Sequence, residues 1–204
     1  MKNGYRLAAG TSTRSWAVDA RSRQIALALL VSVFSSPSMA VVLDFEDLAG
    51  SGELAGAGTV YFSQGYSLSY AAAPGEPHPV GFFAVGASWS FNGRSTAFVA
   101  NSCSATTTLV ADDNNPLTLQ SIDLAALNGD KDVTVTFVGT TVLGTTVAET
   151  VPIAGRKVWM THRFHKDFKH LQKVRWTQGD CTANPPSMID NVRVSPSWKA
   201  GKAD

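Results

Sequence analysis

Hydrophobic and polar residues alternate along most of the chain after residue 40, with the two-residue period that is typical of half-buried β-strands. The alternation is clearest at Val133, Val135 and Phe137, which are separated by two threonines. Threonine, valine and aromatic residues fill these runs, as pleated surfaces favour. The pattern predicts strands at residues 41–46, 59–70, 80–85, 96–100, 106–110, 117–124, 132–139, 145–153, 157–164, 171–177 and 189–194.

Turn residues separate these short runs, for example Pro74-Gly75, Asn92-Gly93 and Asn128-Gly129-Asp130. Many short strands with turn signals between them favour a sandwich or barrel over alternating β and α units. The sequence therefore predicts an all-β fold, a two-sheet antiparallel jelly-roll β-sandwich. One domain spans residues 41–194 and a polar C-terminal tail spans 195–204. Residues 161–173 also have apolar residues at helical spacing, so a short helix is an alternative there.

Two acidic segments enclose this domain, Leu43-Asp44-Phe45-Glu46-Asp47-Leu48 at its start and Ile189-Asp190-Asn191-Val192-Arg193-Val194 at its end. A jelly roll brings its first and last strands together, so these carboxylates are expected to meet. In the second segment the apolar alternation slips after Ile189, which indicates a β-bulge.

Residues 1–40 are predicted to be a cleaved secretory signal peptide. Basic residues precede the apolar run Ile25–Phe34, and Ser38-Met39-Ala40 forms a small-x-small cleavage site. The alternative is a membrane anchor, but a span needs about 20 apolar residues. We therefore expect a secreted protein, in the extracellular space or the periplasm, with no transmembrane segment in the mature chain.

Removal of the leader changes the charge. The leader holds five of the 17 basic residues and one of the 16 acidic residues, leaving 12 and 15, a formal charge of −3. Nucleic-acid-binding domains are strongly basic, so nucleic acid is not an expected partner.

Cys103 and Cys181 both lie in the exported part of the chain. In an oxidising compartment two such residues are expected to form one disulfide, and two buried free thiols are the alternative.

Several segments resemble secreted bacterial domains of the PEP-CTERM-type exosortase substrates. They are Asp44-Phe45-Glu46-Asp47-Leu48, the pair of runs at residues 119–125 and 133–139, and residues 171–178 together with Ile189-Asp190-Asn191-Val192. The chain is also distantly similar to jelly-roll carbohydrate-binding modules, which open with a Phe-Glu pair and close with an Ile-Asp-Asn-Val-like strand. The end Ser195–Asp204 departs from the exosortase pattern, which has a Pro-Glu-Pro motif, an apolar helix and basic residues; free secretion is expected instead.

The likeness to carbohydrate-binding modules implies a structural calcium ion (Ca²⁺) held by Glu46 and Asp190, with Asp44 or Asp47 as a further ligand. Calcium prefers six to eight hard oxygen ligands, so this chemistry is sensible. The alternative is that these acids lie on solvated strand faces or cap turns.

Ligand binding has two candidate locations. Trp89 beside Asn92 and Arg94 would offer a flat ring and polar groups to a sugar, although most aromatic residues of a sandwich belong to its core. The second is a basic segment with three histidines, at residues 156–175, which would meet acidic polysaccharide or phosphates. The alternative for this segment is a solvated polar face.

Catalysis has little support, because the chain lacks a nucleophile elbow and a phosphate-binding glycine loop. The sequence therefore predicts a secreted, non-catalytic module for a polysaccharide or cell-surface glycan. The alternatives are a structural matrix protein without a specific ligand and a glycan-cleaving jelly-roll enzyme.

Overall fold

The computed structural model describes residues 39–49, 54–75, 81–88, 96–100, 102, 104–127, 131–155, 158–177 and 187–197, all within the unit Ser38–Asp204. A short 3-10 helix, η1 (Glu46–Leu48), follows the first strand. The strands are β1 (Val41–Leu43), β2 (Leu54–Gly58), β3 (Val60–Ser63), β4 (Tyr66–Ala71), β5 (Phe82–Val85), β6 (Ala97–Ala100), β7 (Thr106–Ala111), β8 (Leu117–Ala126), β9 (Val133–Thr141), β10 (Thr146–Ile153), β11 (Met160–Arg163), β12 (Leu171–Thr177) and β13 (Ser187–Pro196).

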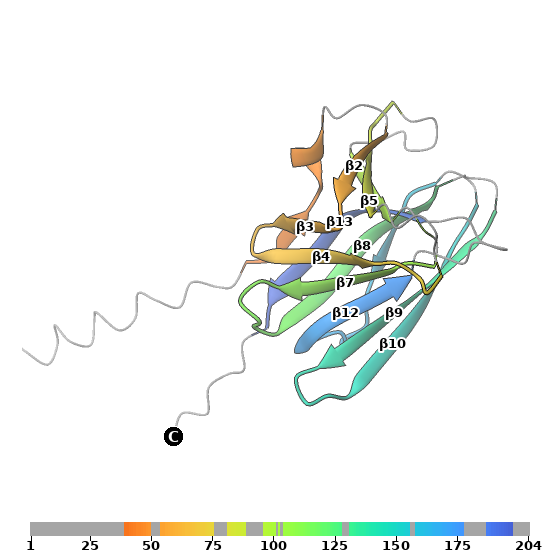
Figure 1. Cartoon of the computed structure of the whole chain (residues 1–204). Helices are drawn as coiled ribbons and strands as arrows, with labels where there is room; N and C mark the ends of the chain where they lie inside the picture. The colour runs from red at the N-terminus through yellow and green to blue at the C-terminus, as the bar shows by residue number, and fades with distance from the viewer. Residues whose placement is uncertain are drawn as a thin grey trace, which may run out of the picture. The chain divides into compact units, whose positions relative to one another are not determined.

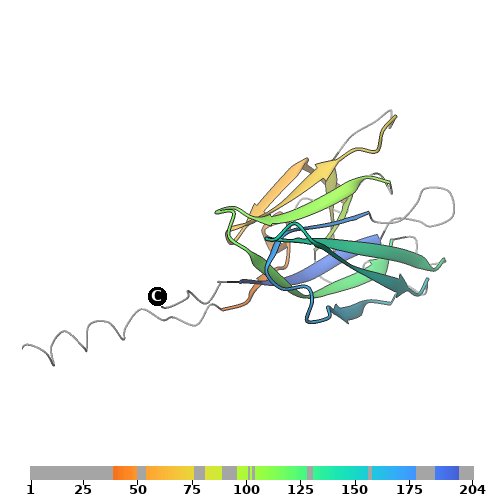
Figure 2. The ribbon, with the colours of Figure 1, turned by 90° about the horizontal axis from the view of Figure 1, so that it is seen from below.

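The strands form two antiparallel layers packed face to face. One layer, sheet A, has the order β2-β5-β6-β13-β8-β11, with β1 beside the second half of β13. The other layer, sheet B, has the order β3-β4-β7-β12-β9-β10 and lies in front of β13 and β8 in Figure 1. Figure 2 shows the same layers from below. Among the described residues, the one ladder pair between the two sheets is Leu171 with Leu117. From β6 to β9 successive strands alternate between the layers, so the predicted jelly-roll sandwich is confirmed.

The predicted meeting of the chain's first and last strands is also confirmed. Strand β1 pairs with β13 in antiparallel register, Val41 opposite Val194 and Leu43 opposite Val192. Sheet A therefore contains both ends of the described domain, and β13 continues two residues beyond the predicted end at Val194.

At three places the strands differ from the prediction for local reasons. The strand predicted at 41–46 stops at Leu43, because Phe45 adopts a left-handed backbone with φ 57°. The run 59–70 is a hairpin, since Gln64 and Gly65 both have positive φ, as a tight two-residue hairpin turn requires. Strand β2 was not predicted: its sequence, LAGAG, has no bulky alternation.

The stretch 161–173 is not a helix. Strand β11 ends at Arg163 and turns follow before β12 begins at Leu171. The helical spacing of Phe164 and Phe168 instead brings two aromatic rings together, with centroids 4.8 Å apart. Among the residues that the structure describes, no helix is long and apolar enough to cross a membrane.

An aromatic cluster occupies one end of the core between the sheets. Phe45 stacks on Phe98 with centroids 4.6 Å apart, and the Phe82 ring lies tilted against Phe98 at 4.5 Å. Tyr61 of sheet B contacts both Phe45 and Phe98. These rings are buried, and aromatic pairs of this kind add to the stabilisation that burial gives. The left-handed turn at Phe45 therefore serves packing, because it directs this ring into the core.

Tyr61 also carries a hydrogen bond: its hydroxyl donates to Asp47 Oδ1 at 2.6 Å. Burial, and next this hydrogen bond, raise the pKa of Tyr61 well above its ordinary value of 10.0. A raised folded-state pKa means that the stabilisation is complete below about pH 10 and is lost as the pH rises further.

We expect alkaline titration of stability to reveal this residue. In the wild type the free energy of unfolding should fall above pH 10, by at most about 1.4 kcal/mol per pH unit for one group. Tyr61→Phe should cost about 1 kcal/mol at neutral pH for the lost hydrogen bond and should reduce the alkaline slope. Some slope should remain, because burial also raises the pKa of Tyr66. Urea unfolding between pH 7 and 11 measures both effects; an identical slope in the two proteins would contradict this assignment.

Candidate functional site

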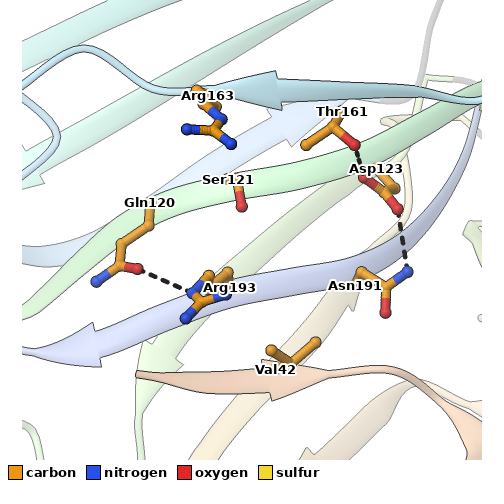
Figure 3. Close-up of a pocket in the computed structure, with 8 residues that line it drawn as sticks. All are labelled: Val42, Gln120, Ser121, Asp123, Thr161, Arg163, Asn191 and Arg193. Atoms are coloured by element: carbon orange, nitrogen blue, oxygen red, sulfur yellow. Dashed lines mark hydrogen bonds between the residues drawn. The ribbon is translucent and has the colours of Figure 1, made fainter. Parts of the chain in front are cut away.

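A polar hollow of about 490 Å³ lies on the outer face of sheet A, the face that points away from sheet B. Strands β1, β13, β8 and β11 supply its walls (Figure 3). The lining residues are Val42, Gln120, Ser121, Asp123, Thr161, Arg163, Asn191 and Arg193.

Strand register arranges these side chains in two rows across the sheet. In the first row Ser121 of β8 lies opposite Arg163 of β11 on one side and Arg193 of β13 on the other. In the second row Asp123 of β8 lies opposite Thr161 of β11. The rows are two residues apart along β8, which corresponds to about 6.7 Å in an extended strand.

Two irregularities in the pairing of β8 with β13 aim additional side chains into the hollow. The register passes from Val194–Leu119 to Arg193–Ser121, so Gln120 is an extra residue in β8. It then passes from Arg193–Ser121 to Asp190–Asp123, so β13 holds an extra residue there. Bulges re-aim side chains in this way. The slip predicted in the last strand is thus confirmed, and Asn191, with φ 46°, lies at it.

Asp123 is held by neighbours on both sides. Its Oδ1 accepts a hydrogen bond from the Thr161 hydroxyl at 2.5 Å, and its Oδ2 accepts one from Asn191 Nδ2 at 3.0 Å. The same amide nitrogen lies 3.3 Å from Asp190 Oδ2. Because its nitrogen is occupied by the two carboxylates, Asn191 directs its carbonyl oxygen away from Asp123, toward Val42 (Figure 3).

The opposite end of the hollow is cationic. Gln120 Oε1 accepts a hydrogen bond from Arg193 Nε at 3.2 Å, while Gln120 Nε2 donates to Ser195 Oγ at 3.1 Å. Gln120 therefore orients the Arg193 guanidinium. Arg163 is exposed, and its side chain extends from the edge strand β11 toward β8. Within the described part of the chain, the ion pairs involve only histidines, so neither arginine is paired with a carboxylate there.

A second hollow, of about 450 Å³, lies on the outer face of sheet B. Its lining is Thr106, Thr136, Val138, Thr140, Thr146, Arg175, Trp176 and Thr177. Trp176 is only 2% exposed, so its ring face is not available as a stacking platform. This surface offers mainly threonine hydroxyls, with fewer distinct polar groups than the hollow on sheet A.

Each of the three predicted calcium ligands makes hydrogen bonds with a different part of the chain. Glu46 Oε1 accepts a hydrogen bond from the Thr96 backbone N–H at 2.9 Å, at the start of β6. Asp44 Oδ1 caps the Glu46 N–H at 3.3 Å. Asp190 is fully buried and accepts the Asn191 N–H at 2.7 Å.

These three carboxylates do not fit one ion shell in this arrangement. Over the described ranges, no group of three or more His, Cys, Asp or Glu side chains is placed to hold a metal ion. The cross-strand partner of Asp190 is Asp123 rather than an acid of the opening segment. The calcium clip of Glu46, Asp190 and Asp44 stays a prediction.

Other predicted site residues lie outside the described residues, namely Trp89, Asn92 and Arg94, together with the cysteine pair Cys103 and Cys181. The predicted glycan platform and the disulfide therefore stay predictions. Other aromatic residues of the first half, Tyr61, Tyr66 and Phe82, are buried in the core.

The basic histidine segment is divided by the fold. His162 Nε2, on β11 of sheet A, lies 2.9 Å from Glu149 Oε1, on β10 of sheet B. His165 Nδ1 lies 3.0 Å from Asp167 Oδ2 at the surface. Arg163, between them, points to the opposite face and into the hollow. Arg163 belongs to the basic segment that the sequence singles out, whereas Gln120, Asp123, Asn191 and Arg193 were not predicted as site residues. The slip in the closing strand was the signal that could have located them.

No protein-family model and no curated protein matches the sequence. Among solved structures, the chain is similar to a variant of a family 29 carbohydrate-binding module, with 11% identity and a TM-score of 0.39, over 78% of this chain and 86% of that chain. It is similar to the tandem family 22 modules of Xyn10C from Paenibacillus barcinonensis, with 10% identity and a TM-score of 0.41, over 81% of this chain and 47% of that one. The chain thus spans about half of that tandem structure.

A third similar structure is the family 11 carbohydrate-binding module from Clostridium thermocellum, solved in complex with a β-1,3-1,4-mixed-linked tetrasaccharide. Its identity is 10% and its TM-score 0.31, over 80% of this chain and 99% of that one. These three structures are carbohydrate-binding modules. The likeness to exosortase substrates stays a prediction. Identities of this size concern the fold alone.

The bulge at Asn191 has a testable energetic signature. Asn191→Ala and Asn191→Gly both remove the amide that bridges Asp123 and Asp190, but only glycine adopts positive φ without steric cost. We expect Asn191→Gly to be the more stable of the two variants by about 1 kcal/mol, measured by urea unfolding. Equal stabilities would contradict a left-handed backbone at this position.

The calcium clip is tested by thermal unfolding of chelator-treated protein. Ion binding to the folded state alone would raise Tm by mass action. Glu46→Gln is the informative variant, because it removes the charge and keeps an acceptor for the Thr96 N–H. The clip predicts a rise in the wild type that is lost in this variant; an unchanged wild-type Tm at millimolar calcium would contradict it.

Proposed function

We propose that this protein is a non-catalytic module that binds a glycan in the polar hollow on sheet A. The observation that carries the proposal is the convergence of amide, hydroxyl, carboxylate and guanidinium groups on one hollow of about 490 Å³. That volume lies within the range of ligand sites, about 300–1,000 Å³.

The chemistry of the lining selects a polar ligand. Sites for drug-like small molecules are lined mainly by apolar and aromatic side chains, whereas here Val42 is the one apolar residue of the lining described. Sugar hydroxyls both donate and accept hydrogen bonds. Asp123 and the Asn191 carbonyl supply acceptors, and Ser121 and the arginines supply donors.

The orientation of these groups supports binding rather than general surface polarity. Thr161 and Asn191 hold Asp123, and Gln120 holds Arg193. Side chains whose rotamers are already restrained lose less conformational entropy when a ligand binds. A structural matrix protein without a ligand would need none of this restraint, so that alternative is the weaker one.

A glycan-cleaving enzyme is the other alternative. Glycoside hydrolysis generally uses two carboxyl groups on either side of the scissile bond. Asp123 is the one carboxylate of the described lining, and its neighbour Asp190 is fully buried, out of reach of a substrate. This arrangement favours binding. With the predicted leader at residues 1–40, the ligand is a polysaccharide or cell-surface glycan outside the cytoplasm.

Two bulky substitutions test the location of binding. Ser121→Trp would fill the hollow on sheet A, and Thr136→Trp would fill the hollow on sheet B, so each is the matched control of the other. Both residues are on outer faces and neither is buried. Affinity electrophoresis against a panel of soluble polysaccharides identifies a ligand, and calorimetry then measures its Kd.

We expect Ser121→Trp to weaken binding at least tenfold and Thr136→Trp to leave it unchanged, with both variants keeping the wild-type Tm. The reverse result would move the site to sheet B. A wild-type protein that binds no member of the panel would leave the matrix-protein alternative ahead.

A further inference from the structure

We propose that the glycan recognised by the sheet A hollow is anionic, with a carboxylate or sulfate group held between Arg163 and Arg193. This inference rests on the proposed function and specifies its ligand class. It comes from the register of three neighbouring strands, which places two cations on either side of one small residue.

The geometry suits a shared anion. Arg163 and Arg193 both lie opposite Ser121, so their backbones are two strand spacings apart, or about 9.5 Å. Serine is too short to separate them, and both arginine side chains are long enough to meet above it. Guanidinium groups bind planar carboxylates and sulfate-like oxygens through paired N–H donors, with charge-assisted hydrogen bonds.

The charges are available for a ligand. Within the described residues neither arginine makes an ion pair with a carboxylate. Arg193 donates through Nε to Gln120 Oε1, which leaves the Nη side of its guanidinium for another acceptor. Asp123, in the neighbouring row, is already engaged by Thr161 and Asn191.

The two rows together form a donor end and an acceptor end. A hexuronate has a carboxylate on one side of its ring and hydroxyl groups on the other. With the carboxylate between the arginines, its hydroxyls would face Asp123 and the Asn191 carbonyl oxygen, about 6.7 Å away along the strands. A neutral sugar would accept hydrogen bonds from the arginines through its hydroxyl oxygens. It would leave the two guanidinium groups without a counter-charge.

The test compares one polymer with and without its charge. Polygalacturonate and alginate are measured against their methyl-esterified forms, and a sulfated galactan against its desulfated form, by calorimetry at low and moderate salt. The variants are Arg163→Gln, Arg193→Gln and Arg193→Lys. Arg175→Gln, in the sheet B hollow, is the matched control, because it removes the same charge from the opposite face. Tm confirms that each variant is folded.

We expect the charged form of at least one polymer to bind at least tenfold more tightly than its neutral form. Arg163→Gln and Arg193→Gln should each remove most of that preference, Arg193→Lys should retain part of it, and Arg175→Gln should leave it unchanged. The polymer that shows the preference distinguishes carboxylate from sulfate.

Three results would overturn the inference in different ways. If binding is lost in Ser121→Trp but is indifferent to esterification and to both arginines, the ligand is a neutral glycan and only the anionic inference fails. If Arg175→Gln weakens binding as much as Arg163→Gln does, the attraction is non-specific. Absence of binding to every polymer, charged or neutral, would remove the proposed function as well.

Discussion

The fold depends on the insertion of the last strand into the middle of sheet A. Strand β13 pairs with β8 along one edge and with β6 and β1 along the other, as Figure 1 shows for β13 beside β8. Without β13, strands β8 and β6 would each expose an unpaired edge. Leu43 and Phe98 would also lose their cross-strand neighbours, Val192 and Ile189. Sheet A is therefore complete only when β13 has paired with β1, β6 and β8. Such non-local pairing is slow to form but strongly constrains the register.

The same strand carries both the core and the candidate site on its two faces. Ile189, Val192 and Val194 pack into the core, while Asn191 and Arg193 face the hollow. A regular strand could not place residues 189, 192 and 194 on one face, because its side chains alternate. The bulge at Asn191 resolves this conflict. Its left-handed backbone is compensated by the hydrogen bonds that the Asn191 amide makes with Asp123 and Asp190. The irregularity is thus required by the core and is used by the hollow.

The strands could be predicted from short-range patterns in the sequence. The candidate site could not, because it depends on the register between strands. The alternation at Val133, Val135 and Phe137 predicted β9, and the two end segments predicted β1 beside β13. Each pattern indicates which face of the strand is buried. The site was not predictable in the same way. Arg163 and Arg193 are 30 positions apart and Asp123 lies in a third strand; only the pairing Arg163–Ser121–Arg193 brings them together. Asp190 illustrates the same point: the sequence assigns this carboxylate to a calcium site, the fold buries it beside Asn191, and its role as a ligand stays a prediction.

The two outer faces of the sandwich differ in chemistry although they share an architecture. The sheet B face is rich in threonines at regular positions, as an unbroken alternation such as Thr134-Val135-Thr136 produces. The sheet A hollow combines seven polar or charged residues with one valine, and two of its members, Gln120 and Asn191, lie where the strand alternation is broken. Regular strands repeat one kind of surface, whereas a bulge gathers different side chains at one place. For recognition of a ligand with several different polar groups, the broken strands are therefore the more suitable surface.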